Sequence, residues 1–319
     1  MTSYTAALDP VGYLAFLIAV GFFAEKTKFL PKLNQGTSLL VTKITLPIMV
    51  IVSLSDQNVE NISATDMFSV LLIGMATIIF LVFINKGIGK LLHVPHERLL
   101  IHSFLGSFGN VIFLAYPFIL QHLGETGLLY AIMYSTANEM LLYSFGVSSL
   151  RRGSQSGDKK WNLKYLINPN TVSFVIGILL FSFKLRLPEF LHKPLDSLGD
   201  TTVPLSMLFI GSTLALTKLK ESFKTISVWL CCTAKMIVVP LVYILIVILT
   251  DLSASGTHNL MITVLIMQIA MPTQTSLSVL AHRYGADATY AAQVIFASTL
   301  ISVITLPLMY MLCTSLFPI

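Results

Sequence analysis

Apolar segments long enough to cross a bilayer follow one another along the chain, separated by short polar connections. A transmembrane helix needs about 20 predominantly apolar residues. By that measure the pattern predicts ten transmembrane helices, at roughly 8–24, 36–55, 66–84, 99–121, 126–150, 166–183, 198–217, 224–249, 259–281 and 287–315. We therefore expect an all-α polytopic membrane protein.

The composition agrees with this interpretation. Hydrophobic residues make up 55% of the 319 residues, charged residues make up 11%, and the mean hydropathy is +0.81. Soluble domains carry roughly 25% charged residues. The three cysteines, Cys231, Cys232 and Cys313, fall within apolar segments, where they predict packing and not a disulfide framework or metal site. No metal and no cofactor is expected.

The basic residues predict the orientation of the chain. Of the 20 Lys and Arg residues, 15 fall in five alternate connections and three fall in the connections between them. Cytoplasmic connections carry the excess of Lys and Arg in membrane proteins. We therefore expect a multi-pass protein of the plasma membrane with both termini extracellular. The net charge of +5 is dispersed in small groups, so no nucleic acid partner is expected.

The longest hydrophilic stretch divides the predicted helices into two groups of five. Because five is odd, the sixth helix starts on the side of the membrane where the first helix ended. The sequence therefore predicts two inverted repeats, residues 1–150 and 166–319, joined by a cytoplasmic loop at 151–165. A faint internal echo, Thr-Leu-Pro at 45–47 and Thr-Val-Pro at 202–204, supports a repeat.

The ninth predicted helix carries a proline within a polar run. Pro272 lacks a backbone donor and prevents the residue four positions before it from keeping its helical bond, so the carbonyl of Gln268 needs another partner. A broken helix at membrane depth is tolerated where it is buried in protein or lines a cavity. Taken alone, the break fits a bent packing helix as well as a binding site.

The fourth predicted helix is interrupted in the same way, by Gly106, Gly109 and Asn110, and Pro117 follows. Breaks at corresponding positions of two inverted halves indicate the binding site of a transporter. Half-helices that meet near the midplane leave positive N-terminal ends available to an anion. We expect the substrate site to contain Asn110, Pro117, Gln268, Pro272, Gln274, Thr275 and Ser276.

Ionisable residues inside the predicted helices need an explanation, because each costs ~2.5 to 3.5 kcal/mol on insertion scales. Glu139, flanked by Asn138, is about midway through the fifth helix, and Lys235 lies in the eighth. Lys43 is nearer the inner end of the second helix, from where its side chain can reach the interface. One hypothesis gives Asn138, Glu139 and Lys235 a role in substrate charge compensation or proton coupling. The alternative pairs Glu139 with Lys235 as structural ions.

Several short motifs occur in an order and spacing that resemble the auxin efflux carrier family, which includes bacterial PIN-like and malate permease-like proteins. They are Gly109-Asn110 followed by Pro117, Asn168-Pro169, Val203-Pro204 with Gly211, Met271-Pro272-Thr273 with Ala281 and Tyr284, and Thr305-Leu306-Pro307. The resemblance covers nearly the whole chain.

The resemblance implies a bile-acid-symporter-like fold, in which ten helices form two inverted repeats and the broken helices 4 and 9 cross. It further implies a scaffold of helices 1, 2, 6 and 7, and a transport domain of helices 3–5 and 8–10 that moves in an elevator-like manner. Homodimerisation through the scaffold is implied as well. Asn110, Pro117 and Pro272 match positions of the family's site.

The function expected from these observations is secondary active or facilitative transport of a small organic anion, a carboxylate such as malate or an auxin-like acid. Proton or sodium coupling is open, and a sodium-coupled symporter of the bile-acid type is the alternative within the same class. An intramembrane enzyme would need a nucleophile and base at membrane depth, and Ser107 lacks a GxSxG setting. A receptor would need a ligand-binding or signalling domain, which the short connections do not provide. We expect no enzymatic activity.

Overall fold

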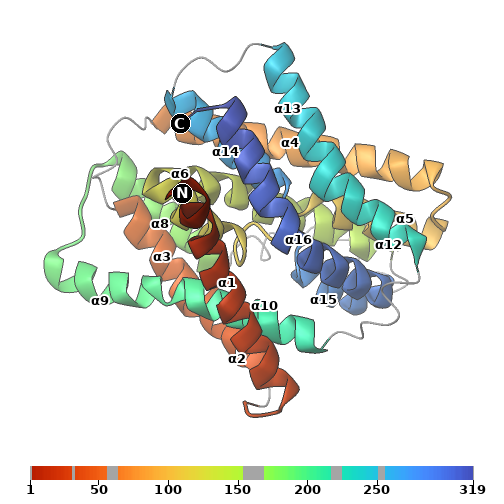
Figure 1. The fold of residues 1–319 in the computed structure, drawn as a ribbon, viewed down its shortest axis with the longest axis horizontal. Coiled ribbons are helices and arrows are strands. Elements are labelled where there is room, and N and C mark those ends of the chain that lie inside the picture. The colour runs from red at the N-terminus through yellow and green to blue at the C-terminus, as the bar shows by residue number, and fades with distance from the viewer. Residues whose placement is uncertain are drawn as a thin grey trace. The chain divides into compact units, whose positions relative to one another are not determined.

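The computed structural model describes residues 2–30, 33–55, 64–153, 169–216, 225–250 and 256–318. Within these ranges the regular structure is helical (Figure 1), as the sequence predicts. Four of the described segments are long and apolar enough to cross a membrane: Leu33–Ser55, Thr65–Leu91, Ile226–Leu249 and Ala288–Leu316. Two shorter helices, Pro169–Ser182 and His258–Ile269, are also apolar.

The chain folds into two compact units, and each unit is assembled from three separate stretches of sequence. The first unit comprises Met1–Met67, Ile112–Ile132 and Ile167–Thr217. The second comprises Phe68–Val111, Met133–Leu166 and Lys218–Ile319. Neither unit coincides with one half of the chain, because both halves contribute helices to both units.

The first unit is built around α1 and α10, which pack against each other, and around α3, which contacts α8 and α9. At the closest approach a Cβ on Gly211 would lie 2.0 Å from the carbonyl oxygen of Ile18, so only glycine fits there. The helices of this unit are α1 (Thr2–Lys26), α2 (Leu33–Leu40), η1 (Val41–Thr45), α3 (Leu46–Ser55), α8 (Pro169–Ser182), α9 (Glu189–Asp200) and α10 (Thr202–Leu216), together with the first part of α6 (Ala115–Leu141).

The second unit holds both helix interruptions in its interior. Its core contacts run from α16 to α12, α14 and α15. Its helices are α4 (Ala64–Leu91), α5 (His96–Ser107), the end of α6, η2 (Leu142–Gly146), α7 (Val147–Gly153), α12 (Ile226–Thr233), η4 (Ala234–Val238), α13 (Val239–Leu249), α14 (Gly256–Ile269), α15 (Ser276–Arg283) and α16 (Ala288–Leu316).

Short π-helical turns widen three of the described helices, at η1, η2 and η4. Pro47 follows η1 and Pro240 follows η4. A proline lacks an N–H group and its ring clashes with the carbonyl one turn earlier, so a wider preceding turn relieves the crowding. Lys43 lies in η1 and is exposed, whereas Lys235 lies in η4 and is 2% exposed.

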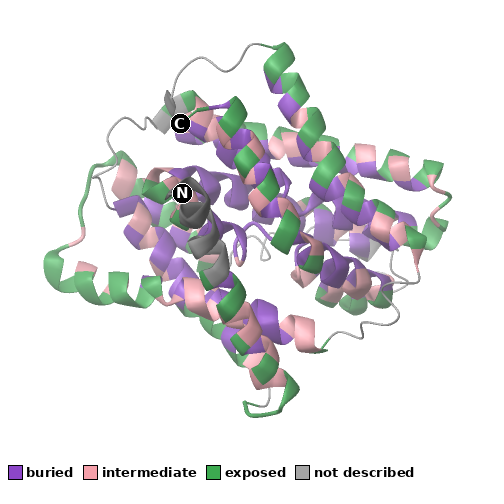
Figure 2. Ribbon diagram, viewed as in Figure 1, coloured by how far each residue is buried: buried purple, intermediate pink, exposed green. Residues whose placement is uncertain are grey.

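Exposed residues occur along most of the helices (Figure 2), and many of them are large and apolar. On α13, for example, Leu241, Leu245 and Ile248 are exposed while Ile244 and Val247 are buried. A helix that is apolar on its buried and its exposed side fits a hydrocarbon surrounding and not water.

Two features differ from the predicted helix boundaries. Helix α9 precedes α10, where the sequence predicts a connection followed by a helix starting near 198. It is only 12 residues long and amphipathic, with Phe190 exposed, so it lacks the apolar length that marks a crossing. In addition, α6 runs across a kink at Gly124, where φ is 68°, between the predicted fourth and fifth helices. Most of the predicted loop at 151–165 lies outside the described residues.

Candidate functional site

Both helix interruptions lie next to each other in the second unit. Helix α5 ends at Ser107, and the next residue, Phe108, is extended with φ −85° and ψ 123°. Helix α14 ends at Ile269, and α15 begins only at Ser276. The first residue after each helix still donates to the carbonyl four residues earlier, Phe108 to Phe104 and Ala270 to Ile266, and the residues beyond find other partners.

The two interruptions pair with each other through their backbones. The N–H of Asn110 donates to the carbonyl oxygen of Pro272 at 2.6 Å, and the N–H of Gln274 donates to the carbonyl oxygen of Phe108 at 3.2 Å. Gly109 and Thr273 thus form an isolated antiparallel bridge. Buried backbone groups in an apolar environment need such partners, and the bridge lets each break satisfy the other.

Side chains complete the bonding at the C-terminal end of α5. The hydroxyl of Thr273 donates to the carbonyl oxygen of Leu105 at 2.9 Å, and the ammonium of Lys235 lies 3.5 Å from the carbonyl oxygen of Gly106. The last carbonyls of a helix lack helical donors and form the negative end of its dipole. A buried cation and a hydroxyl therefore satisfy that end of the half-helix.

The carbonyl of Gln268, which the sequence leaves without its helical donor, accepts a bond from the N–H of Met271 at 3.4 Å. The peptide N–H of Thr273 donates to the hydroxyl of Ser298 on α16 at 3.1 Å. The turn after α14 is thereby held both by its own backbone and by a neighbouring helix.

Gln274 connects the bridge to the buried carboxylate. Its side-chain Nε2 donates to Oε1 of Glu139 at 2.7 Å, and its Oε1 accepts from Nδ2 of Asn138 at 2.9 Å. Asn138 is 0% exposed, and Glu139 and Gln274 are each 9% exposed. One amide side chain thus contacts two neighbouring residues of α6 and, through its backbone, the end of α5.

Three buried polar atoms around this arrangement have no hydrogen-bond partner among the described residues. They are Nδ2 of Asn110, Oδ1 of Asn138 and Oγ of Ser276. A buried polar atom without a partner costs roughly 1 to 3 kcal/mol, so these three atoms are candidate contacts for a ligand or water. We refer to the residues 108–110, 272–276, 138 and 139 as the crossing.

Hydrogen bonds bring together five of the expected residues: Asn110, Asn138, Glu139, Pro272 and Gln274. Lys235 contacts the carbonyl of Gly106, near the C-terminal end of α5. Ser276 begins α15 and Thr275 precedes it, both partly exposed. Gln268 is buried in the last turn of α14. Pro117 lies in the first turn of α6 and belongs to the first unit, whereas the other expected site residues belong to the second unit.

Glu139 and Lys235 do not form an ion pair with each other in the described part of the chain. The carboxylate of Glu139 accepts from Gln274, whereas the ammonium of Lys235 contacts a backbone carbonyl. The two charges are thus held by separate partners.

Thr273 and Ser298 contribute contacts that the expected site did not include. The position of Thr273 directly after Pro272 is a local signal of its role, because a residue that follows a helix break has to find bonds outside its own helix. Ser298 lies in a continuous helix without such a signal.

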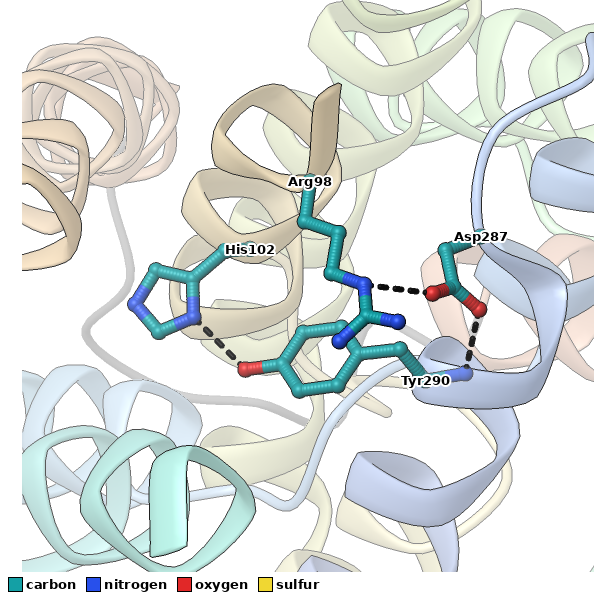
Figure 3. A network of polar contacts seen from close by, with 4 residues as sticks. All are labelled: Arg98, His102, Asp287 and Tyr290. Atoms are coloured by element: carbon teal, nitrogen blue, oxygen red, sulfur yellow. Dashed lines mark hydrogen bonds and ion pairs between the residues drawn. The ribbon is translucent and has the colours of Figure 1, made fainter. Parts of the chain in front are cut away.

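A second polar network, which the sequence analysis did not identify, joins the first turns of α5 and α16 (Figure 3). Nε of Arg98 pairs with Oδ2 of Asp287 at 2.6 Å, and Oδ1 of Asp287 accepts from the N–H of Tyr290 at 2.8 Å. The hydroxyl of Tyr290 lies 2.7 Å from Nδ1 of His102, and the Arg98 guanidinium lies over the tyrosine ring. Asp287 thus caps α16 and binds α5 at once.

Comparison with known proteins places this arrangement in context. The chain matches the family described as "Membrane transport protein" over residues 6–160 and 158–310. It is 26% identical over 316 residues to an uncharacterized transporter of Methanocaldococcus jannaschii, covering 94% of this chain and 97% of that protein. It is 22% identical over 314 residues to a Rhizobium meliloti protein named "Putative malonate transporter", covering 95% and 94%.

Proposed function

Because the chain belongs to the membrane transport protein family, as its auxin efflux carrier motifs predict, we propose that this transporter is a secondary carrier of a small organic anion. The substrate is a carboxylate such as malate or malonate, or an auxin-like acid. It crosses the plasma membrane by alternating access, with both termini of the protein extracellular. Relatives of the family are transporters, and we propose no catalytic step.

The observation that carries this proposal is the pairing of the two helix breaks at the crossing. The unpartnered Nδ2 of Asn110 is a hydrogen-bond donor, and the N-terminal end of α15 begins at Ser276 beside the bridge. Lys235 adds a buried positive charge at the end of α5. Donors, a helix N-terminus and a cation together favour an anionic ligand.

A carboxylate is favoured among anions by the chemistry of the site. Amide donors and the first turn of a helix bind carboxylates without a metal. The relative from Rhizobium meliloti carries malonate in its name, which supports a short dicarboxylate as the first compound to test.

The arrangement of Lys235 favours transport without sodium over the bile-acid type of symport. Its ammonium lies 3.5 Å from the carbonyl oxygen of Gly106, where a coupling cation could otherwise bind. The ammonium of Lys235 would occupy the position of that cation and supply its positive charge. We therefore propose proton coupling or facilitated transport, and assign sodium coupling to the alternative.

The division into two units supports an elevator-type movement. The first unit holds α1, α2, α3, α8 and α10, which cover the expected scaffold helices 1, 2, 6 and 7, and it also holds α9 and residues 112–132, which belong to the expected helices 4 and 5. The second unit holds the whole crossing, so we propose that it carries the substrate while the first unit remains fixed. We further propose that the scaffold forms a homodimer in the lipid bilayer.

Uptake by the purified protein in liposomes tests this function. Radiolabelled malonate, malate and indole acetate are offered under imposed pH, sodium and voltage gradients. We expect saturable uptake of at least one anion, loss of that uptake in Asn110→Ala, and normal uptake in the matched control Asn259→Ala at the start of α14. Uptake that requires sodium would favour the symporter alternative, and no uptake of any anion would reject the proposed function.

A further inference from the structure

The carboxylate of Glu139 fixes the orientation of two neighbouring amides. An ionised carboxylate only accepts hydrogen bonds, whereas an amide side chain offers a donor at one end and an acceptor at the other. The group of Gln274 that faces Glu139 is therefore its Nε2, and Oε1 faces Asn138. Asn138 has to present Nδ2 to that oxygen, and its own Oδ1 remains buried without a partner among the described residues.

We propose that Gln274 relays the protonation state of Glu139 to Asn138, so that protonation converts the unpartnered end of the Asn138 amide from an acceptor into a donor and prepares the crossing for an anion. This inference rests on the proposed function, because it names the proton as the regulator of the same site.

The conversion requires only rotations of two amide groups. When Glu139 carries a proton, its O–H can donate to Oε1 of Gln274. Nε2 of Gln274 then donates to Oδ1 of Asn138, and Nδ2 of Asn138 takes the place that the unpartnered oxygen held. The oxygen and nitrogen of an amide have nearly the same size, so the surrounding packing is unchanged.

The backbone of Gln274 keeps this relay in place during the rotations. Its N–H is bound to the carbonyl oxygen of Phe108, so the side-chain amide turns while the main chain stays attached to α5. The relay also touches the bridge, because Gln274 follows Thr273 directly.

Few ionisable groups face Glu139. Tyr143, one turn later on the continuation of α6, is the titratable neighbour that interacts with it electrostatically among the described residues. The crossing segment presents the neutral amide of Gln274. Lys235, from η4, is bound to the carbonyl of Gly106 and not to the carboxylate. A proton on Glu139 therefore acts mainly on the side-chain amides of Gln274 and Asn138.

Linkage gives the direction of the effect. If protonation of Glu139 strengthens anion binding, a bound anion favours the protonated form by the same factor. One coupled proton changes the dissociation constant by about tenfold per pH unit at most. The anion should bind more tightly as the pH falls, until Glu139 is fully protonated.

Binding measured as a function of pH tests the relay. The full-length protein in lipid nanodiscs is titrated with radiolabelled malonate, malate and indole acetate between mildly acidic and mildly alkaline pH. For wild type we expect the dissociation constant of the bound anion to rise by up to about tenfold per pH unit. Glu139→Gln and Gln274→Met should bind with a constant that does not change with pH.

Gln274→Met is the decisive variant, because it keeps Glu139 and the direct interaction of Glu139 with Asn138, and removes the amide that bonds to both. The control Ser302→Ala removes a buried hydroxyl whose partner is the carbonyl of Thr299, and it should retain the wild-type dependence on pH. Persistence of the wild-type dependence in Gln274→Met would overturn the relay, as would pH-independent binding by wild type, and either result leaves the carrier function standing.

Infrared difference spectra between low and high pH test the relay without any anion. Wild type should show a protonated-carboxyl band together with changes in side-chain amide bands. Glu139→Gln should lose the carboxyl band, and Gln274→Met should keep it while losing the amide changes. A carboxyl band with no amide change in wild type would refute the relay. Absence of binding to every anion would instead reject the proposed carrier function, and the spectra would still decide the relay.

Discussion

The N–H of Asn110 donates a 2.6 Å hydrogen bond to the carbonyl oxygen of Pro272, across two helices that each end before reaching the other. The interaction is short, and it joins backbone groups whose sequence positions differ by more than half the chain. It makes each interruption depend on the other, so a change that restores helix at one break removes a partner from the other.

Pro272→Ala should therefore impair transport while leaving a folded protein. Alanine restores a backbone donor and the best helix propensity, which lets α14 continue through residue 272 and weakens the bridge to Asn110. We expect initial uptake rates to fall by about tenfold or more, the equivalent of ~1.4 kcal/mol at the crossing. Size-exclusion chromatography of the same sample shows whether the fold is retained.

The control for this variant is Pro307→Ala, which changes a proline inside the unbroken helix α16. It should leave uptake close to wild type, because no bridge depends on it. Uptake kinetics of Pro272→Ala that match wild type would argue against the crossing as the substrate site.

Lys235→Met should separate binding from stability. A buried charge with a single long contact gains little from its surroundings, so replacement by an apolar side chain of similar length is neutral or stabilising. If the ammonium compensates the charge of the anion, the dissociation constant should rise by about tenfold or more. Thermal unfolding and binding titrations measured on one preparation give both quantities.

Lys43→Met provides the comparison, since Lys43 also lies in a π-helical turn but is exposed. Its binding constant should stay at the wild-type value. A Lys235→Met protein that binds the anion normally would assign Lys235 to the structure of α5 alone.

Gly106→Ala should destabilise the second unit. A Cβ at residue 106 would lie 2.4 Å from Oδ1 of Asn85, whose Nδ2 is already bound to the carbonyl of Leu81. Overpacking of this kind costs typically 1 to 3 kcal/mol, which here is about a few degrees of unfolding temperature. Gly87→Ala on the same helix as Asn85 meets open space and should be neutral or slightly stabilising. Equal unfolding temperatures for the two variants would contradict the close contact.

Substitutions at Asp287 should distinguish its cap from its ion pair. Asp287→Asn keeps an acceptor for the N–H of Tyr290 but loses the charge that pairs with Arg98. The free energy of unfolding should therefore fall by less than about 1 kcal/mol. Asp287→Ala loses both the cap and the ion pair, and its free energy of unfolding should fall by about 1 kcal/mol more. Thermal unfolding should rank wild type, then Asn, then Ala.

The exposed pair Glu189 and Lys193 serves as the reference, because Glu189→Gln removes a surface charge without a cap and should not change the unfolding temperature. If Asp287→Ala unfolds at the same temperature as Asp287→Asn, the cap of α16 contributes nothing measurable.

The positions of the breaks could be predicted from the sequence because their causes are local. Pro272 removes a donor from its own helix, and glycine and asparagine at 109 and 110 weaken theirs. The bonding partners were not predictable in the same way. Thr273 binds Leu105 across 168 positions and Lys235 reaches Gly106 across 129, and no pattern along one segment specifies such pairs.

Helix α9 shows a different limit of the sequence pattern. Twelve residues with charged and apolar side chains mixed do not resemble a crossing helix, and Pro194 in its interior argues against a helix altogether. Pro188 precedes its first residue with a preset backbone angle, and the buried Gly199 brings α9 into contact with Met49 of α3. The tertiary contact decides the conformation where local propensity is weak.

The hydrogen bond between Glu139 and Gln274 spans 135 residues, which has a consequence for biosynthesis. Translation at about 5–20 residues per second separates the appearance of the two residues by on the order of 10 s. During that interval Glu139 lacks its glutamine partner, and inserting an acidic side chain at the centre of a membrane helix costs ~2.5 to 3.5 kcal/mol. Glu139 therefore gains its glutamine donor only late in synthesis, when all of the chain except α15 and α16 has been made.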